Sequence, residues 1–129
     1  MPNILTKEIL FAKYKVQNLE EIKNLNLWGN DIENIEIIKD LHNVEVIGLS
    51  VNKINTLQYF SYCPELTELY LRKNGIEDIK EIIYLKNCPK LKILWLEENP
   101  ISNNPNYRQY IINTLPQLVK LDNVSITLS

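Results

Sequence analysis

The sequence predicts an α/β solenoid, in which short parallel strands stack side by side and helical turns connect them. Three observations predict this fold class. A chain of 129 residues with 45% apolar and 23% charged side chains fits one folded domain rather than two. Leucine, isoleucine and asparagine dominate the composition, with 19, 18 and 17 copies. Asparagine also recurs at intervals of 22, 22 and 25 residues, at Asn30, Asn52, Asn74 and Asn99, which indicates an internal repeat.

The repeated unit has the form L-x-x-L-x-L-x-x-N-x-L, with Ile or Val accepted in place of Leu. Four complete copies are followed by one partial copy: Ile22–Ile32, Val44–Ile54, Leu66–Ile76, Leu91–Ile101 and then Leu118–Asn123. This is the pattern of a leucine-rich repeat, and four copies in phase make chance improbable. We therefore predict a right-handed leucine-rich-repeat solenoid with a parallel concave sheet and a cap at each end.

Each position of the repeat has a physical reason. The x-Leu-x-Leu-x alternation is typical of a short strand whose leucines point inward. The asparagine follows the strand, where its amide can bond backbone groups of the turn, and stacked repeats would align these amides into a ladder. Apolar residues then recur every third position, which favours a 3₁₀ or short helical return on the convex side. These are Ile32, Ile35, Ile38 and Leu41, then Ile54, Leu57, Phe60 and Cys63, then Ile76, Ile79, Ile82 and Leu85.

A solenoid must cover its two open ends. Thr6 is placed to cap the N-terminus of a short helix in which Ile9, Leu10 and Tyr14 would cover the first repeat. Residues 105–116 are predicted to form an amphipathic helix ended by proline, followed by a last strand that contains Leu121. Its apolar face carries Tyr107, Ile111 and Leu115. We therefore divide one domain into an N-terminal cap (1–21), four repeats (22–101) and a C-terminal cap (102–129).

The outward positions of the predicted strands form the candidate binding surface. Alternation places both tryptophans of the chain on the solvent-facing side of the sheet, in the company of a tyrosine and an arginine. Exposed aromatic and Arg side chains have the composition of an interface hot spot, although the same aromatics could instead stack and support the sheet. The predicted partner-binding residues are Trp28, Val46, Tyr70, Arg72, Ile93, Trp95 and Glu97.

No motif for catalysis, a metal or a cofactor stands out. His42 is the one histidine, Cys63 and Cys88 are expected to be small buried core thiols, and three glycines do not make a phosphate loop. A formal charge of −2 and a pI near 5.5 argue against direct binding of nucleic acid. No apolar run approaches the roughly 18 residues of a membrane span, and no secretory signal is evident. We expect a non-enzymatic, monomeric interaction domain of a reducing compartment.

Three groups of residues carry a family resemblance. The 22-residue spacing resembles the SDS22-like class of leucine-rich repeats, and residues 107–122 resemble the C-terminal cap of the U2 small nuclear ribonucleoprotein A′ type. The strings Leu27–Gly29, Gly48–Asn52, Glu68–Asn74 and Leu94–Pro100 are similar to a family of cilia- and flagella-associated proteins. In that family a variable stretch and an oligomerising C-terminal helix follow the repeats, so the chain is expected to be an isolated N-terminal domain.

The resemblance implies a function that the residues alone do not. It implies a protein of the cytoplasm and cytoskeleton that acts in cilium, flagellum and basal-body assembly, with a NIMA-related protein kinase as a partner. The shared cap leaves a U2 A′-like splicing scaffold as an alternative. The SDS22-like class leaves a third, a regulatory subunit that docks on a protein phosphatase.

Overall fold

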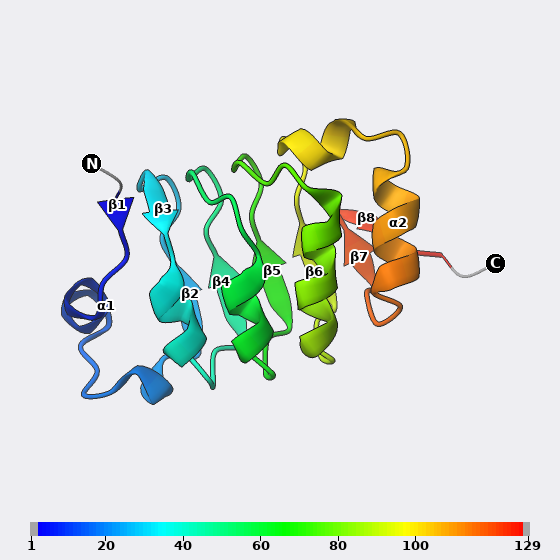
Figure 1. The fold of residues 1–129 in the computed structure, drawn as a ribbon. Coiled ribbons are helices and arrows are strands. Elements are labelled where there is room, and N and C mark those ends of the chain that lie inside the picture. Colours follow the sequence, from blue (N-terminus) through cyan, green and yellow to red (C-terminus); the bar gives the residue numbers. More distant parts are fainter. Residues whose placement is uncertain (1–2, 128–129) are drawn as a thin grey trace.

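The structure, a computed structural model, describes residues 3–127 and shows a single row of parallel strands (Figure 1). The six-stranded sheet has the order β2-β4-β5-β6-β7-β8, and only the last pair is antiparallel. Its strands are β2 (Asn24–Asn26), β4 (Val46–Gly48), β5 (Glu68–Tyr70), β6 (Ile93–Trp95), β7 (Lys120–Leu121) and β8 (Val124–Ser125). A separate parallel pair joins β1 (Asn3–Ile4) to β3 (Ile32–Asn34). The predicted leucine-rich-repeat fold with a parallel sheet is confirmed, whereas β1, β3 and β8 were not predicted.

The period-three segments form the helical returns on one side of the sheet (Figure 1). They are the 3₁₀ helices η2 (Glu36–Asp40), η3 (Gln58–Tyr62) and η4 (Ile79–Asn87). Ile38, Phe60 and Ile82 are fully buried in them, because three residues per turn bring every third side chain to the same face. Shorter 3₁₀ turns, η1 (Leu19–Glu21) and η5 (Pro100–Asn103), flank the array.

The inward leucines of successive strands stack in register and form one continuous core. Leu25 lies beside Ile47, which lies beside Leu69, and the row continues through Leu94 to Leu121. All five are at most 1% exposed. The strand alternation read from the sequence is therefore confirmed from β2 to β7, and it fixes which side chains face out.

The asparagine ladder exists, but only where a preceding repeat supplies partners. The Asn52 side chain accepts the N–H groups of Asn30 and Ile32 at 3.0 and 2.9 Å and donates to three carbonyls, including that of Leu27 at 3.0 Å. Asn74 and Asn99 bond in the same manner. The Asn30 side chain is exposed and bonds only the carbonyl of Trp28, at 2.9 Å. The prediction that Asn30 belongs to the ladder is wrong, because no repeat precedes it.

The N-terminal cap follows the prediction with one correction. Helix α1 (Lys7–Tyr14) begins after Thr6, whose hydroxyl accepts the N–H of Ile9 at 3.2 Å. Leu10 is fully buried, but Ile9 is 46% exposed and does not cover the first repeat, because it lies off the buried face of the helix. The Tyr14 hydroxyl accepts the N–H of Asn26 at 2.8 Å, and so satisfies a donor on the open edge of β2.

The C-terminal cap packs the predicted face against the last repeat. Helix α2 (Tyr107–Thr114) is shorter than the predicted 105–116. Its Tyr107 and Ile111 side chains, and that of Leu115 just after it, are at most 9% exposed. The Tyr107 hydroxyl donates to Asp122 at 2.6 Å. Burial, and then this hydrogen bond, raise the pKa of Tyr107. Asp122 also accepts the N–H groups of Leu96 and Glu97, at 2.6 and 3.0 Å, so one carboxylate ties the cap to the turn that follows β6.

The expected core thiols are confirmed. Cys63 and Cys88 are fully buried and free, and their thiols lie near the carbonyl oxygens of Ile38 and Phe60, at 3.6 and 3.2 Å. Burial raises the pKa of each thiol to about 12. Both cysteines are therefore uncharged at neutral pH and act as small apolar side chains. His42 is an exposed turn residue, with Nδ1 4.0 Å from the carboxylate of Glu20.

Candidate partner-binding face

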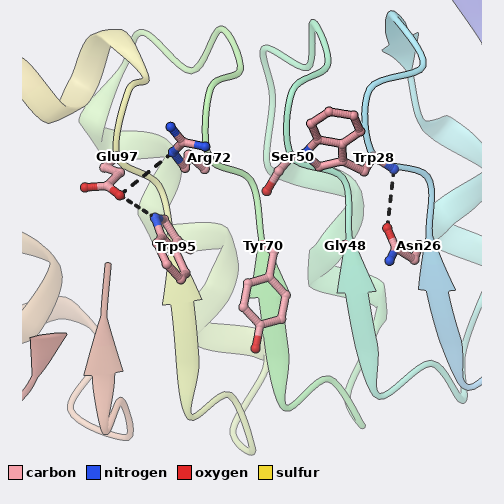
Figure 2. A pocket seen from close by; sticks show the side chains of 8 residues that line it. All are labelled: Asn26, Trp28, Gly48, Ser50, Tyr70, Arg72, Trp95 and Glu97. Atoms are coloured by element: carbon pink, nitrogen blue, oxygen red, sulfur yellow. Dashed lines mark hydrogen bonds and ion pairs between the residues drawn. The ribbon is translucent and has the colours of Figure 1, made fainter. Parts of the chain in front are cut away.

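Outward residues at the ends of strands β2, β4, β5 and β6, and in the turns that follow them, line an open hollow of about 490 Å³. We call it the concave hollow, and Figure 2 shows its lining residues from close by. The repeat places them, because the strand ends at the same letter in each unit and the alternation sends every second side chain outward. They are Asn26, Trp28, Gly48, Ser50, Tyr70, Arg72, Trp95 and Glu97.

Five of the seven residues predicted for partner binding line this hollow: Trp28, Tyr70, Arg72, Trp95 and Glu97. The other two, Val46 and Ile93, are half-buried on the same sheet. They begin their strands, two residues before Gly48 and Trp95, and do not line the hollow.

Sequence reasoning did not select Asn26, Gly48 and Ser50, which complete the hollow. They occupy the same outward positions as the selected residues, so the alternation was a sufficient signal. Small or polar side chains gave no chemical reason to choose them. Their smaller side chains leave the hollow open between the larger ones, and this can be recognised only once the structure shows which residues are neighbours.

The aromatic residues differ in how much they are covered. Tyr70 and Trp95 are paired across β5 and β6, with ring centroids 6.4 Å apart and planes tilted by 46°. This contact leaves Trp95 half-buried, so the expectation that it is solvent-exposed is wrong in degree. Trp28 is 64% exposed on the far side of Gly48. Support of the sheet accounts for the Tyr70–Trp95 pair but not for the open Trp28.

The charged groups hold the side chains of the hollow in place. Arg72 contacts Glu98 at 2.8 Å and Glu97 at 3.9 Å, so its ion pair with Glu98 is the closer of the two. The same Glu97 carboxylate accepts the indole N–H of Trp95 at 2.8 Å, as Figure 2 shows. The Tyr70 hydroxyl donates to Glu68. Burial, and then this bond and the negative charge of Glu68, raise the pKa of Tyr70 to about 12.

Neither clustered metal ligands nor a membrane-spanning helix is found in the described part of the chain. Among residues 3–127, the side chains of His, Cys, Asp and Glu nowhere gather in a group of three suited to a metal ion. No helix within that range has both the length and the apolar character to cross a membrane. The concave hollow combines aromatic rings, an arginine and a carboxylate, which is the composition of a protein interface.

Repeat pattern, fold and surface together define the class of protein. The chain belongs to the leucine-rich-repeat family, whose model matches residues 3–129. It is similar to cilia- and flagella-associated protein 410 of Homo sapiens, with 43% identity over 95% of this chain and 49% of that protein. The Mus musculus protein of the same name is 41% identical over 95% of this chain and 50% of its own length. The chain thus spans about half the length of these two relatives.

The fold is also found among solved structures. A chain in the crystal structure of the Drosophila melanogaster SNF/U2A′ complex superimposes with a TM-score of 0.79 and 25% identity. The match covers 98% of this chain and 70% of that one. It therefore extends over both caps as well as the repeats.

Proposed function

We propose that the chain is a non-catalytic interaction scaffold of the cilium or flagellum, which binds a partner protein through the concave hollow. The observation that carries the proposal is the open Trp28 beside the Tyr70–Trp95 pair and Arg72. Exposed aromatic rings are costly unless something covers them. The similarity to cilia- and flagella-associated proteins supports the cellular setting.

The test of the binding face compares outward and inward substitutions in the full-length protein. Trp95→Ala, and Tyr70→Ala combined with Arg72→Ala, are expected to weaken partner binding by more than about 2 kcal/mol, the hot-spot scale. Their stability should fall by less, since they lose contacts on a solvated face. Leu71→Ala removes a fully buried side chain and should cost about 2–5 kcal/mol of folding free energy.

The readout is a binding titration beside a urea denaturation curve for each variant. Normal binding by the outward variants, together with early unfolding, would show that the aromatic residues only support the sheet. The interface would then have to lie elsewhere on the protein.

The finer parts of the proposal concern the partner and the place. We propose a NIMA-related protein kinase as the partner and the basal body as the site of action, both of which follow from the family resemblance. Affinity purification of the full-length protein from ciliated cells, followed by mass spectrometry, tests the partner. A fluorescent tag tests the place, and exclusion of the tagged protein from basal bodies contradicts that part.

A second function, a splicing scaffold, has one specific observation in its favour. The structural match to the SNF/U2A′ complex includes the C-terminal cap, where Tyr107 and Asp122 are hydrogen-bonded. Co-purification with a small RNA-recognition protein, instead of with ciliary proteins, would support it. In this case too the chain would contact protein rather than nucleic acid.

A further inference from the structure

The backbone of strand β4 does not require the glycine at position 48. The φ of Gly48 lies outside the left-handed region, and its carbonyl accepts the N–H of Leu27 at 2.9 Å as in any paired strand. A Cβ there would meet the Asn26 side chain at 3.3 and 3.5 Å and the carbonyl of Leu25 at 3.7 Å. Glycine weakens a strand, and where its conformation is ordinary it often marks close approach of a ligand or another chain.

The absent side chain opens the floor of the concave hollow between large neighbours. Gly48 pairs with Asn26 on one side and Tyr70 on the other. The next two strands carry Tyr70 and Trp95 at the equivalent position, and the Trp28 ring reaches over the turn at the end of β4, beside Ser50 (Figure 2). We call the opening over Gly48, bounded by Trp28 and Tyr70, the Gly48 socket. The Asn26 side chain borders the socket on the β2 side, 3.3 Å from the position that a Cβ of residue 48 would take.

Negative charge exceeds positive charge around these rings. Arg72 is shared between Glu97 and Glu98, which leaves that group with one net negative charge. Glu68 has the neutral Tyr70 hydroxyl as its bonded neighbour and forms no ion pair within residues 3–127. Aromatic faces attract cations through their electron-rich rings, and nearby carboxylates add to that attraction.

We infer that the Gly48 socket receives one arginine or lysine side chain from a partner protein. The methylene stem of that side chain would lie between Trp28 and Tyr70, and its charge would be held by the aromatic faces and the uncompensated carboxylates. The inference rests on the proposed function, because it names the chemistry that the partner brings to the same face. An inserted acidic side chain is disfavoured by the net charge of the site.

The first experiment is a nuclear magnetic resonance titration of the protein with blocked amino acids. N-acetyl-arginine amide is compared with N-acetyl-citrulline amide, which has the same length and shape without the charge. The arginine probe should shift the Gly48 amide and the indole signals of Trp28 and Trp95 in a saturable manner. Its affinity should exceed that of the citrulline probe by about two- to fivefold, the range for an exposed cation on aromatic rings. Equal affinity for the two probes overturns the inference.

The second experiment fills the socket. Gly48→Val and Gly48→Ala place methyl groups over the strand and should abolish or sharply weaken the saturable shifts, while the melting temperature is retained. Gly75→Ala is the matched control, because Gly75 also has an ordinary φ, lies outside the hollow and would place its Cβ 3.5 Å from the nearest atom, the carbonyl of Ile54. If Gly48→Val folds poorly, Gly48→Ala decides the question. Undiminished arginine binding by a folded Gly48 variant overturns the inference.

The two proposals fail in different ways. Suppose that Trp95→Ala abolishes partner binding but the protein does not prefer the arginine probe to the citrulline probe. The proposed binding face is then supported, and the inference of an inserted cationic side chain is overturned. A clear arginine preference with normal partner binding by the Trp95→Ala and Gly48→Val variants shows that the socket takes a cation but that the partner binds elsewhere.

Discussion

The first and second repeats use the same asparagine to different effect. Asn52 is 8% exposed and bonds backbone groups of its own turn and of the preceding repeat. Asn30 is exposed and bonds only within its own turn. A repeat position thus acquires its stabilising role from the neighbour that precedes it, which is the nearest-neighbour character expected of a solenoid.

The turn just before each asparagine shows a related difference. All four repeats have a left-handed residue there, with φ between 58° and 68°. The first repeat uses Gly29, for which this conformation is free of strain, whereas the second uses Val51, a β-branched residue that rarely adopts it. The ladder around Asn52 holds the strained turn in place, whereas the first repeat has no such support for its own.

The largest expected effect on stability comes from deleting the C-terminal cap, which is the neighbour of the last repeat. Deletion of residues 105–129 removes five buried side chains and the Asp122 bonds to Leu96 and Glu97, just after β6. The five are Tyr107, Ile111, Leu115, Leu118 and Leu121. Loss of each buried side chain costs about 2–5 kcal/mol, and the sum approaches the whole stability of a small domain. We expect an aggregated or unfolded chain by size-exclusion chromatography and circular dichroism. A monomer with an unchanged melting temperature would show that the cap is dispensable.

An intermediate effect should separate the two asparagines directly. Asn52→Ala leaves buried backbone groups without partners and should lower the free energy of unfolding by about 1–3 kcal/mol. Asn30→Ala, the matched control, removes one bond in an exposed turn and should cost about 0.5 kcal/mol or less. Urea denaturation of both variants checks this. Equal midpoints would mean that the ladder does not depend on the preceding repeat.

The smallest expected effect concerns the left-handed turns. Val51→Gly relieves about 1–2 kcal/mol of backbone strain and gives back about 0.5–1 kcal/mol through the greater freedom of the unfolded chain. The free energy of unfolding should therefore rise by about 0.5–1 kcal/mol. The reverse exchange, Gly29→Val, should lose a similar amount, because φ is +68° there although no atom lies within 4 Å of the added Cβ. Thermal unfolding of both variants measures these changes in stability. A change of the same sign in the two variants would contradict the role of backbone strain.

Much of the fold was predictable because its signals are local. A two-residue alternation decides which strand side chains face the core, and a three-residue period decides which face of a return helix is buried. These patterns correctly predicted the inward row from Leu25 to Leu121 and the buried faces of η2 and η3. The four-residue spacing of Tyr107, Ile111 and Leu115 did the same for the C-terminal cap. Thr6 was also predictable as a cap, because its bond to Ile9 spans three residues.

The features that were not predictable depend on partners far along the chain. Tyr14 closes the edge of β2 across 12 residues, and Asp122 reaches Leu96 across 26. Arg72 lies closer to Glu98, a residue of the next repeat with a left-handed backbone, than to Glu97. The pairing of β8 with β7 follows from how the cap folds back, and no repeat pattern encodes it.

The candidate binding face also has some features that the local sequence determines and others that depend on distant parts of the chain. The sequence by itself determined that Trp28, Tyr70, Arg72, Trp95 and Glu97 face outward, because side-chain direction in a strand depends only on the parity of the position. Only the tertiary structure decided that they surround one hollow, that Val46 and Ile93 lie outside it, and that Gly48 forms its floor. Those facts depend on which strands become neighbours and on the space that each side chain leaves unfilled. Space of this kind is a property of several repeats together and of no single segment of the chain.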